Sequence, residues 1–473
     1  LKDAAATAIY GSRAAGGVIV ITTKRGQSGK TNISISSNIS VQMQPQRDGN
    51  LMSATEKLEW EENLWEEFSK EGFVKNEYYP VIGIVGMLRS GWIGKNGKLK
   101  DEEGYEPMSR QEQDTYIAGL KKNTTNWFDE IFRNAVSASN HIAISGGNRN
   151  VNYYLSFGNT TDKGLLKGTS YDRYTLSTNM DFKPDERTNY NLNIYLSQQK
   201  SDGPSLNVNP FLYAYFANPY ERPHNEDGSY RGDMTWFNGK RVNGNIEEGY
   251  PTSGYNIFRE MDETSAKSKN RSANVTFKIN YRIWEKLELS GILSYAFTEN
   301  TSDNINGANT YAAFRDRLFF DYRTKRTYGS ITQAIAENDS YSARGQFHYS
   351  TDLGAHGKIS LYGGTEIRLQ KSKSIFSKRY GYDPLTGISS IPLPPGTPDA
   401  SFDLNFIKQY GQVTDNLTET TYRKTDSPPF TRLSTTITKT AISSALHSVR
   451  TVPIISAARS NSTPPGQSAW HGI

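Results

Sequence analysis

Residues 31–43 read TNISISSNISVQM, and the pattern of this stretch decides how the chain folds. Its apolar side chains all fall at odd positions, with polar residues between them: Ile33, Ile35, Ile39, Val41 and Met43. Successive side chains of a β-strand point to opposite faces, so this alternation predicts a strand with one apolar and one polar face.

The same alternation recurs along the chain, which gives about nine predicted strands. The other eight are 138–146, 150–158, 171–182, 188–199, 269–283, 286–299, 341–351 and 358–370. Several have 11 or more residues, whereas strands of globular proteins most often have about five or six and a tilted membrane strand needs about 9–11. The strand lengths therefore favour a membrane-spanning sheet.

Short and long connections alternate between the predicted strands. The long ones are 44–137, 159–170, 200–268 and 300–340, and each is followed by one short turn. Outer-membrane barrels alternate in this way, with short periplasmic turns and longer extracellular loops. We therefore predict an all-β chain that forms part of a transmembrane antiparallel β-barrel.

A soluble β-sandwich is the alternative, because its strands also have one apolar and one polar face. Alternation alone does not separate the two folds. Loops longer than about 12–15 residues are uncommon in compact domains, and three of the connections far exceed that length. Strand length and loop length together favour the barrel.

Composition excludes several classes of protein. The 473 residues include 54 basic and 49 acidic side chains, six His and no Cys. Without Cys there is no disulfide scaffold, thiolate metal site or cysteine nucleophile. No window reaches the roughly 18 apolar residues of a membrane-spanning helix, and the small, dispersed positive charge does not predict nucleic-acid binding.

The sequence has no pattern that indicates catalysis. It contains no G-x-S-x-G, no H-E-x-x-H and no complete calcium loop. We therefore predict that the protein is not an enzyme and needs no metal or cofactor.

Two loop segments carry features of their own. Ser53–Glu56 forms a capping box before a stretch rich in Glu and aromatic residues, which predicts a helix that either contacts a partner or packs on its own loop. Phe211–Tyr220 and Trp236–Phe237 are aromatic, and they either stack on sugar rings or pack within the loop.

The first 26 residues read LKDAAATAIYGSRAAGGVIVITTKRG, which predicts a short helix, a glycine-rich turn and an apolar strand. Gly11 and Gly16 have the spacing of a phosphate-binding loop. Gly17 and Val18 stand where that loop needs Lys and Ser or Thr, which argues against a phosphate site.

This segment resembles the end of the plug domain in TonB-dependent outer-membrane transporters, most closely the SusC/RagA branch. The residues that match the motif are Asp3, Ala8, Ile9, Tyr10, Gly11, Ser12, Arg13, Gly17, Val18, Thr22 and Lys24. Further resemblance lies at 127–132, 141–147, 152–154, 218–220 and 225–228, so it covers about residues 1–425.

The resemblance implies a barrel of about 22 strands with a plug in its lumen. It also implies a location in the outer membrane of a Gram-negative bacterium, surrounded by lipid bilayer. The cargo would be bulky nutrients, commonly oligosaccharides and in some members peptides. The partners would be the TonB energy-coupling complex, acting through an N-terminal region that the chain lacks, and a SusD-like surface lipoprotein.

On this basis we divide the chain into three parts. Residues 1–30 are predicted to be the C-terminal end of the plug, and 31–425 the N-terminal part of the barrel with long extracellular loops. Residues 426–473 form an atypical tail, because no acidic residue follows Asp426 and Ser, Thr and Pro dominate. The tail is either an unusual extracellular loop or a non-native ending such as a translated frameshift, and the second interpretation is favoured.

Three functions from different classes remain open at this point. The first is part of a TonB-dependent importer. The second is an outer-membrane receptor or adhesin that binds without transporting. The third is a soluble extracellular β-protein that binds glycans.

Overall fold

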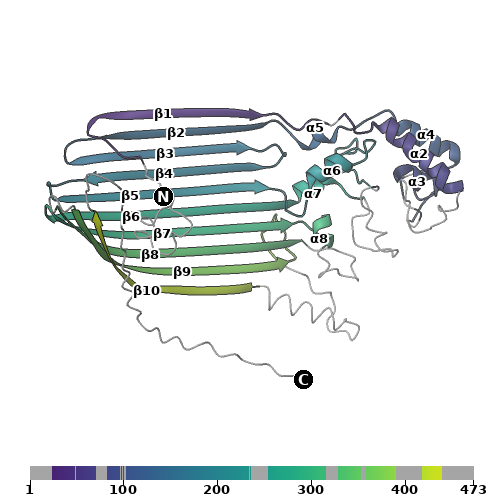
Figure 1. Cartoon of the computed structure of the whole chain (residues 1–473). Coiled ribbons are helices and arrows are strands. Elements are labelled where there is room, and N and C mark those ends of the chain that lie inside the picture. Colours follow the sequence, from purple (N-terminus) through teal and green to yellow (C-terminus); the bar gives the residue numbers. More distant parts are fainter. Residues whose placement is uncertain are drawn as a thin grey trace, which may run out of the picture.

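In the part of the chain that the structure describes, a single antiparallel sheet carries helical loops at one end (Figure 1). The structure, a computed structural model, describes residues 24–47, 49–70, 83–95, 97–98, 100, 103–233, 235, 254–315, 329–352, 358–389 and 418–438. The ten strands lie side by side in chain order, from β1 to β10, and each pairs with the next. Among the described residues β1 and β10 are the two edges of the sheet.

All nine predicted strands are present, and a tenth was not predicted. The strands are β1 (Gly29–Gln42), β2 (Ala135–Gly147), β3 (Val151–Lys163), β4 (Ser170–Phe182), β5 (Thr188–Gly203), β6 (Thr264–Trp284), β7 (Leu287–Asn306), β8 (Ser330–Asp352), β9 (Lys358–Tyr380) and β10 (Thr418–Thr438). The prediction from the sequence is about nine strands, and the described residues form ten.

Two adjacent prolines explain why β10 was missed. Pro428 and Pro429 interrupt any apolar alternation, and proline is confined to sheet edges and bulges because it has no backbone N–H to donate. The register between β10 and β9 shifts between Ser427 and Phe430, so a bulge accommodates both prolines. β10 also runs across the predicted boundary at 425/426, which stays a prediction; residues 439–473 lie outside the described residues.

Several strands extend beyond the residues that show apolar alternation. β7 continues to Asn306, β8 begins at Ser330 and β9 continues to Tyr380, all at the end that carries the long loops. Their apolar residues, such as Ile331, Ile335 and Phe376, are few and are separated by charged or polar residues on the same face, so a pattern that depends on one continuous apolar face does not detect these extensions.

The two faces of the sheet differ in chemistry. Residues directly opposite one another form an apolar row across β1 to β5, and every side chain in it is at least 37% exposed: Ile35, Ile142, Phe157, Leu176 and Leu196. The next row belongs to the other face and is polar: Ser36, His141, Gly158, Thr175 and Ser197. We call these the apolar face and the polar face.

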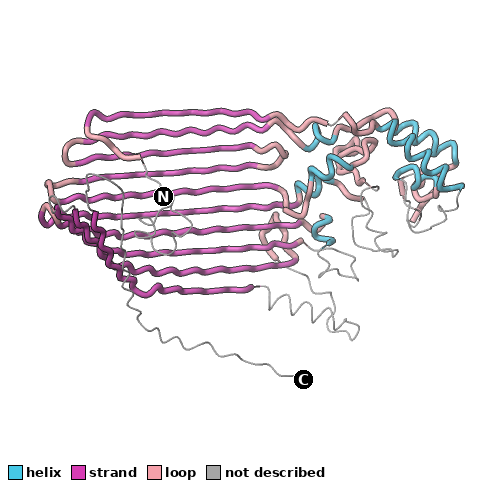
Figure 2. Tube along the Cα trace, viewed as in Figure 1, coloured by secondary structure: helices cyan, strands magenta, loops and turns pink. Residues whose placement is uncertain are grey.

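Helices occupy the loops beyond one end of the strands (Figures 1 and 2). They are α2 (Ala54–Lys70), α3 (Gly83–Arg89), α4 (Arg110–Leu120), α5 (Trp127–Ile131), α6 (Pro210–Phe216), α7 (Ile257–Asp262) and α8 (Tyr311–Arg315). None of the helices in the described ranges is long and apolar enough to cross a membrane.

The buried apolar residues form two clusters in these loops. The first cluster joins α2, α3, α4 and Tyr220, and the second joins α5, α6 and α7. In the sheet, the buried apolar side chains among the described residues are Ala135, Ala143, Ile331 and Tyr380. The core therefore lies in the loops, above the end of the sheet.

Candidate functional site

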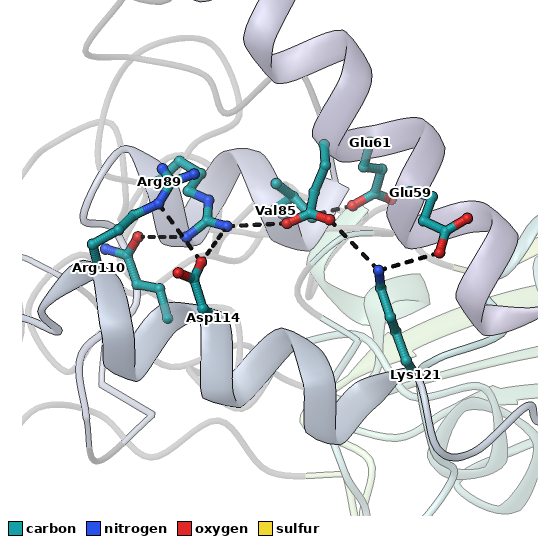
Figure 3. Close-up of polar contacts among 9 residues, drawn as sticks. Glu59, Glu61, Val85, Arg89, Arg110, Asp114 and Lys121 are labelled. Atoms are coloured by element: carbon teal, nitrogen blue, oxygen red, sulfur yellow. Dashed lines mark hydrogen bonds and ion pairs between the residues drawn. The ribbon is translucent and has the colours of Figure 1, made fainter.

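The outer helices α2, α3 and α4 are held together by a buried arginine (Figure 3). The guanidinium of Arg89 on α3 forms ion pairs with Glu62 on α2, at 3.0 Å, and with Asp114 on α4, at 2.7 Å. Its side chain is only 2% exposed. Lys121, just after α4, adds longer ion pairs to Glu59 and Glu62, so charges from three elements fix the geometry of this helical unit.

A fully buried glutamate connects this helical unit to the second long loop. Glu61 Oε1 accepts a hydrogen bond from the Tyr220 hydroxyl at 2.8 Å, and Oε2 accepts from the Val85 N–H at 3.2 Å. The Ile84 N–H donates in turn to the Tyr220 hydroxyl. Burial raises the pKa of the Glu61 carboxyl, and burial beside Glu61 raises the pKa of Tyr220.

Gly83 makes this arrangement possible. Its φ of +46° lies in the left-handed region, and a Cβ there would overlap the Glu61 carboxylate. Glu61 was not singled out from the sequence, where it is one of several Glu in α2. The spacing of Ala54, Leu58 and Glu61, at i, i+4 and i+7, could have placed it on the buried face.

Helix α6 exposes a group of aromatic side chains beyond the ends of the strands. Tyr213 and Ala214 are buried in the second cluster, which turns the opposite side of the helix outward. Phe211 and Tyr215 are one turn apart, and their rings lie 5.3 Å apart. Phe216 follows at 6.3 Å from Tyr215 and is 68% exposed. We call Phe211, Tyr215 and Phe216 the aromatic strip.

Neighbouring side chains hold the aromatic strip in position. The Asn209 side chain accepts from the Leu212 N–H at 2.9 Å and caps α6, with Pro210 at its first turn. Phe128 of α5 packs edge-on against Tyr215, with ring centres 5.3 Å apart. The Tyr213 hydroxyl donates to Asp233 at 3.0 Å, so the strip rests on a fixed, buried base.

A small open cavity of about 160 Å³ lies beside the strip. Tyr215 and Phe216 form its aromatic side, and Arg47, Lys57 and Asn126 supply polar groups. An aromatic surface beside a few hydrogen-bonding groups is suited to a polar ligand that also has apolar C–H faces.

The polar face of the sheet is lined mainly by amides and hydroxyls. The Asn191 amide donates to Asn179 Oδ1 and to Asp181 Oδ1, at 3.0 Å each. Ser139 and Thr160 form a hydroxyl pair at 3.2 Å. Charged groups on this face include a cluster on β8 and β9, where Glu366 accepts from Arg344 at 2.6 Å and from Arg368 at 2.8 Å. This face offers hydrogen bonds to a hydrated solute.

The predicted motif of the plug end falls almost wholly outside the described residues. Lys24 is described and exposed, while Asp3 to Thr22 are not described, so their role remains a prediction. Trp236 and Phe237 also lie outside the described residues. The capping box is confirmed, because the Ser53 N–H donates to Glu56 at 2.7 Å and α2 begins at Ala54.

The two loop segments divide between the interpretations given to them. In α2, Leu58 and Trp65 pack within the loop, as the packing interpretation expected, while Trp60 is exposed. In 211–220, Tyr213 and Tyr220 are buried, whereas the aromatic strip is exposed. Among the described residues, no group of three or more His, Asp or Glu is placed to hold a metal ion.

Comparison with known proteins gives no matching family model, but it does give related sequences. TonB-dependent receptor SusC of Bacteroides thetaiotaomicron is 27% identical over 403 residues, which cover 82% of this chain and 33% of that protein. TonB-dependent receptor P3 of Formosa agariphila is 23% identical over 388 residues, covering 80% of this chain and 31% of that protein. The chain spans about a third of the length of these curated relatives.

Solved structures share the fold. The RagAB peptide transporter aligns with a TM-score of 0.57 at 18% identity, over 92% of this chain and 43% of that one. The closed-closed state of the RagAB peptide importer gives a TM-score of 0.55 with the same identity and coverage.

The open antiparallel sheet, with its apolar face and its helical loops at one end, thus has the fold of part of the β-barrel in the RagAB structures. Its curated relatives are TonB-dependent receptors, SusC among them, so over the part that it spans the chain resembles SusC/RagA-type TonB-dependent transporters. The resemblance inferred from the sequence is confirmed. The named relatives are receptors and transporters rather than enzymes, which supports the absence of catalysis at the level of the family.

Proposed function

We propose that the chain forms part of an importer in the outer membrane of a Gram-negative bacterium and that its cargo is an oligosaccharide. TonB would supply the energy, and a SusD-like lipoprotein would cover the extracellular end. The observation that carries the choice of cargo is the aromatic strip at the loop end of the strands, where Phe216 is 68% exposed and Phe211 is 51% exposed.

Two features of the molecule support an oligosaccharide. Sugar rings have C–H faces that pack on aromatic rings, and hydroxyls that exchange hydrogen bonds with amides and carboxylates. The aromatic strip supplies the first kind of surface, and the polar face, with Asn179, Asn191 and the Ser139–Thr160 pair, supplies the second. The apolar face would meet lipid.

The test is uptake of fluorescently labelled oligosaccharides by cells that express the full-length transporter of which this chain would be a part. We expect uptake that stops when TonB is deleted. We also expect Phe216→Ala to raise the concentration for half-maximal uptake roughly tenfold, by removing a stacking surface. Leu206→Ala is the matched control, because Leu206 is 91% exposed in the same loop but lies outside the aromatic strip.

Different outcomes point to different functions. Uptake that survives deletion of TonB would contradict a TonB-dependent importer. Binding to the cell surface without uptake would favour the receptor or adhesin. Purification without detergent would favour the soluble glycan-binding protein.

A peptide is the second candidate cargo, because the solved structures that share the fold are named peptide importers. Aromatic side chains also bind apolar residues of peptides. A labelled peptide pool supplied to the same cells separates the two. Uptake of peptides but not of oligosaccharides, with the same sensitivity to Phe216→Ala, would replace the proposed cargo.

A further inference from the structure

The apolar face changes character towards the loop end of the strands. Leu196 on β5 and Ala273 on β6 lie directly opposite each other, and they are the outermost apolar pair of this face on the two strands. Continuing outward on the same face, the next pairs are Gln198 with Arg271, Lys200 with Lys269, and Asp202 with Lys267. Charged residues therefore replace apolar ones within a few positions.

Two of these three pairs are balanced by their neighbours. The Arg271 guanidinium contacts Gln198 Oε1 and Glu299 Oε1, each at 3.4 Å. Lys267 lies between Asp202 on β5 and Asp303 on β7. The middle pair differs, because two ammonium groups, those of Lys200 and Lys269, stand directly opposite each other.

The strands on either side supply one carboxylate and one hydroxyl to Lys200 and Lys269, so this pair of lysines keeps a net positive charge. Asp172 on β4 is opposite Lys200 on its far side, and Thr301 on β7 is opposite Lys269. Neither lysine forms an ion pair with a carboxylate of the described residues. Like charges directly opposite each other destabilise a sheet, so a bound anion between them would relieve the repulsion.

Their height matches the head-group layer of a bilayer. Each lysine is four positions beyond the last apolar pair. This is about 13 Å along the strand and roughly 10 Å of height at the usual tilt of barrel strands. Head groups extend roughly 5–8 Å beyond the hydrocarbon. A lysine side chain can bend back towards that layer while its ammonium stays hydrated.

We propose that Lys200 and Lys269, with Arg271 beside them, bind the phosphate of a phosphorylated glycolipid head group in the outer leaflet. The proposal rests on the membrane location given under the proposed function. It does not depend on the cargo or on energy coupling. The binding fixes the rotation and depth of this part of the barrel against the lipid.

The experiment titrates the purified protein in detergent micelles with diphosphorylated lipid A and with enzymatically dephosphorylated lipid A, and follows the complexes by native mass spectrometry. We expect the phosphorylated lipid to bind more tightly. We expect the double variant Lys200→Ala, Lys269→Ala to lose roughly ten- to thirtyfold in affinity for it. Affinity for the dephosphorylated lipid should stay unchanged.

Lys267 on β6 and Lys373 on β9 give the matched control, with the same loss of charge on the same face. Lys267 lies between Asp202 and Asp303, and Lys373 pairs with Glu337 at 3.8 Å. The double variant Lys267→Ala, Lys373→Ala should bind lipid A as the wild type does. An equal loss in this control would overturn the proposal.

The variant Lys269→Glu controls for a loss of lipid binding that is caused by misfolding. This change makes an opposite-charge pair with Lys200, so the sheet should fold at least as well, as judged by heat-modifiable migration. It should nevertheless lose the preference for the phosphorylated lipid. Equal binding of both lipids by the wild type, or full displacement of lipid A by millimolar inorganic phosphate, would contradict a lipid site. Failure of oligosaccharide uptake would leave these results unaffected.

Discussion

The sheet and its loops bury their apolar side chains in opposite ways. In the sheet, large apolar residues such as Ile35, Leu155 and Leu293 are 43–75% exposed. In the loops, Leu58, Leu88 and Ile131 are fully buried. The two regions belong to one chain, yet only the loops have a core that excludes water by themselves.

This difference is expected if the loops are surrounded by water and the apolar face of the sheet is surrounded by lipid. The loop helices are stabilised by removing apolar surface from water. In the proposed membrane location the sheet would be stabilised by its backbone ladders, because backbone groups inside a bilayer must be paired within the protein. Its apolar face would then meet lipid. The same substitution should therefore have different effects in the two regions.

The largest effect is expected from truncating a core residue in the loops. Leu58→Ala should cost about 2–5 kcal/mol of local unfolding free energy, because it leaves a cavity between α2 and α3. Leu293→Ala on the apolar face should cost under about 1 kcal/mol, because lipid fills the space. Hydrogen exchange of the α2 and β7 amides measures both. Equal costs would remove the contrast between the regions.

The second prediction reverses the contrast by introducing charge. Leu293→Arg places a guanidinium on the apolar face and should cost about 2–4 kcal/mol in a bilayer. Ser294→Arg, one residue along and on the polar face, should cost far less. The folded fraction of each variant in vesicles, read by heat-modifiable migration in increasing urea, provides the measurement. A greater loss of folded protein from Ser294→Arg than from Leu293→Arg would mean that the polar face, and not the apolar face, meets lipid.

The sheet could be predicted well from the sequence because its two faces meet different surroundings. A strand between lipid and water must alternate, so β1 and β6 are readable from single positions such as Ile33 and Phe277. The pattern fails where that constraint ends. In the loop-end extensions of β7 to β9, charged and polar residues interrupt the apolar face, and the two prolines of β10 break the alternation.

The candidate site was less predictable because it depends on contacts between distant loops. The capping box of α2 is local and was found, and the aromatic segment 211–220 was singled out by composition. Whether a given ring is buried depends on the surrounding elements, which is why Tyr213 and Phe216 differ. The pairing of Glu61 with Tyr220 joins residues 159 positions apart, which no local pattern reveals.

A third prediction concerns pH in the loops. Glu260 on α7 accepts from the Tyr311 N–H at 2.7 Å, and burial raises the pKa of its carboxyl to about 7. A carboxyl that holds its proton more tightly when folded adds stability as the pH falls from above 7 towards its unfolded value near 4.5. The gain should reach up to about 3 kcal/mol.

Glu260→Gln isolates this contribution, because it keeps the size of the side chain but does not titrate. Burial also raises the pKa of Glu61 and Glu221, so the wild type has other contributions of the same sign. Hydrogen exchange around α7 and α8, corrected for the intrinsic effect of pH, should show a weaker pH dependence in the variant. An unchanged dependence would exclude Glu260 as its source. The sheet amides should not respond.

The fourth prediction tests the link between the two long loops. Tyr220→Phe removes the hydroxyl that donates to Glu61 and accepts from Ile84, so buried polar groups lose a partner at a cost of about 1–3 kcal/mol. Tyr230→Phe removes a hydroxyl that donates to Asp262 at an exposed position and should cost less. The rate of protease cleavage within α2 and α4 measures the loss of stability in each of the two variants. Equal cleavage of both variants would mean that the link is weak.

The smallest effect is expected at the start of α2. Ser53→Ala removes the hydroxyl that accepts from the Glu56 N–H at 3.3 Å and donates to the Glu56 carboxylate at 2.9 Å. Loss of such a cap costs about 1 kcal/mol, seen as faster exchange in the first turn. Ser69→Ala, at the other end of the helix, removes only a bond to the Glu66 carbonyl and should cost less. Because the cap is local, its loss should leave β1 to β5 unchanged, and a response in those strands would show that loop and sheet unfold together.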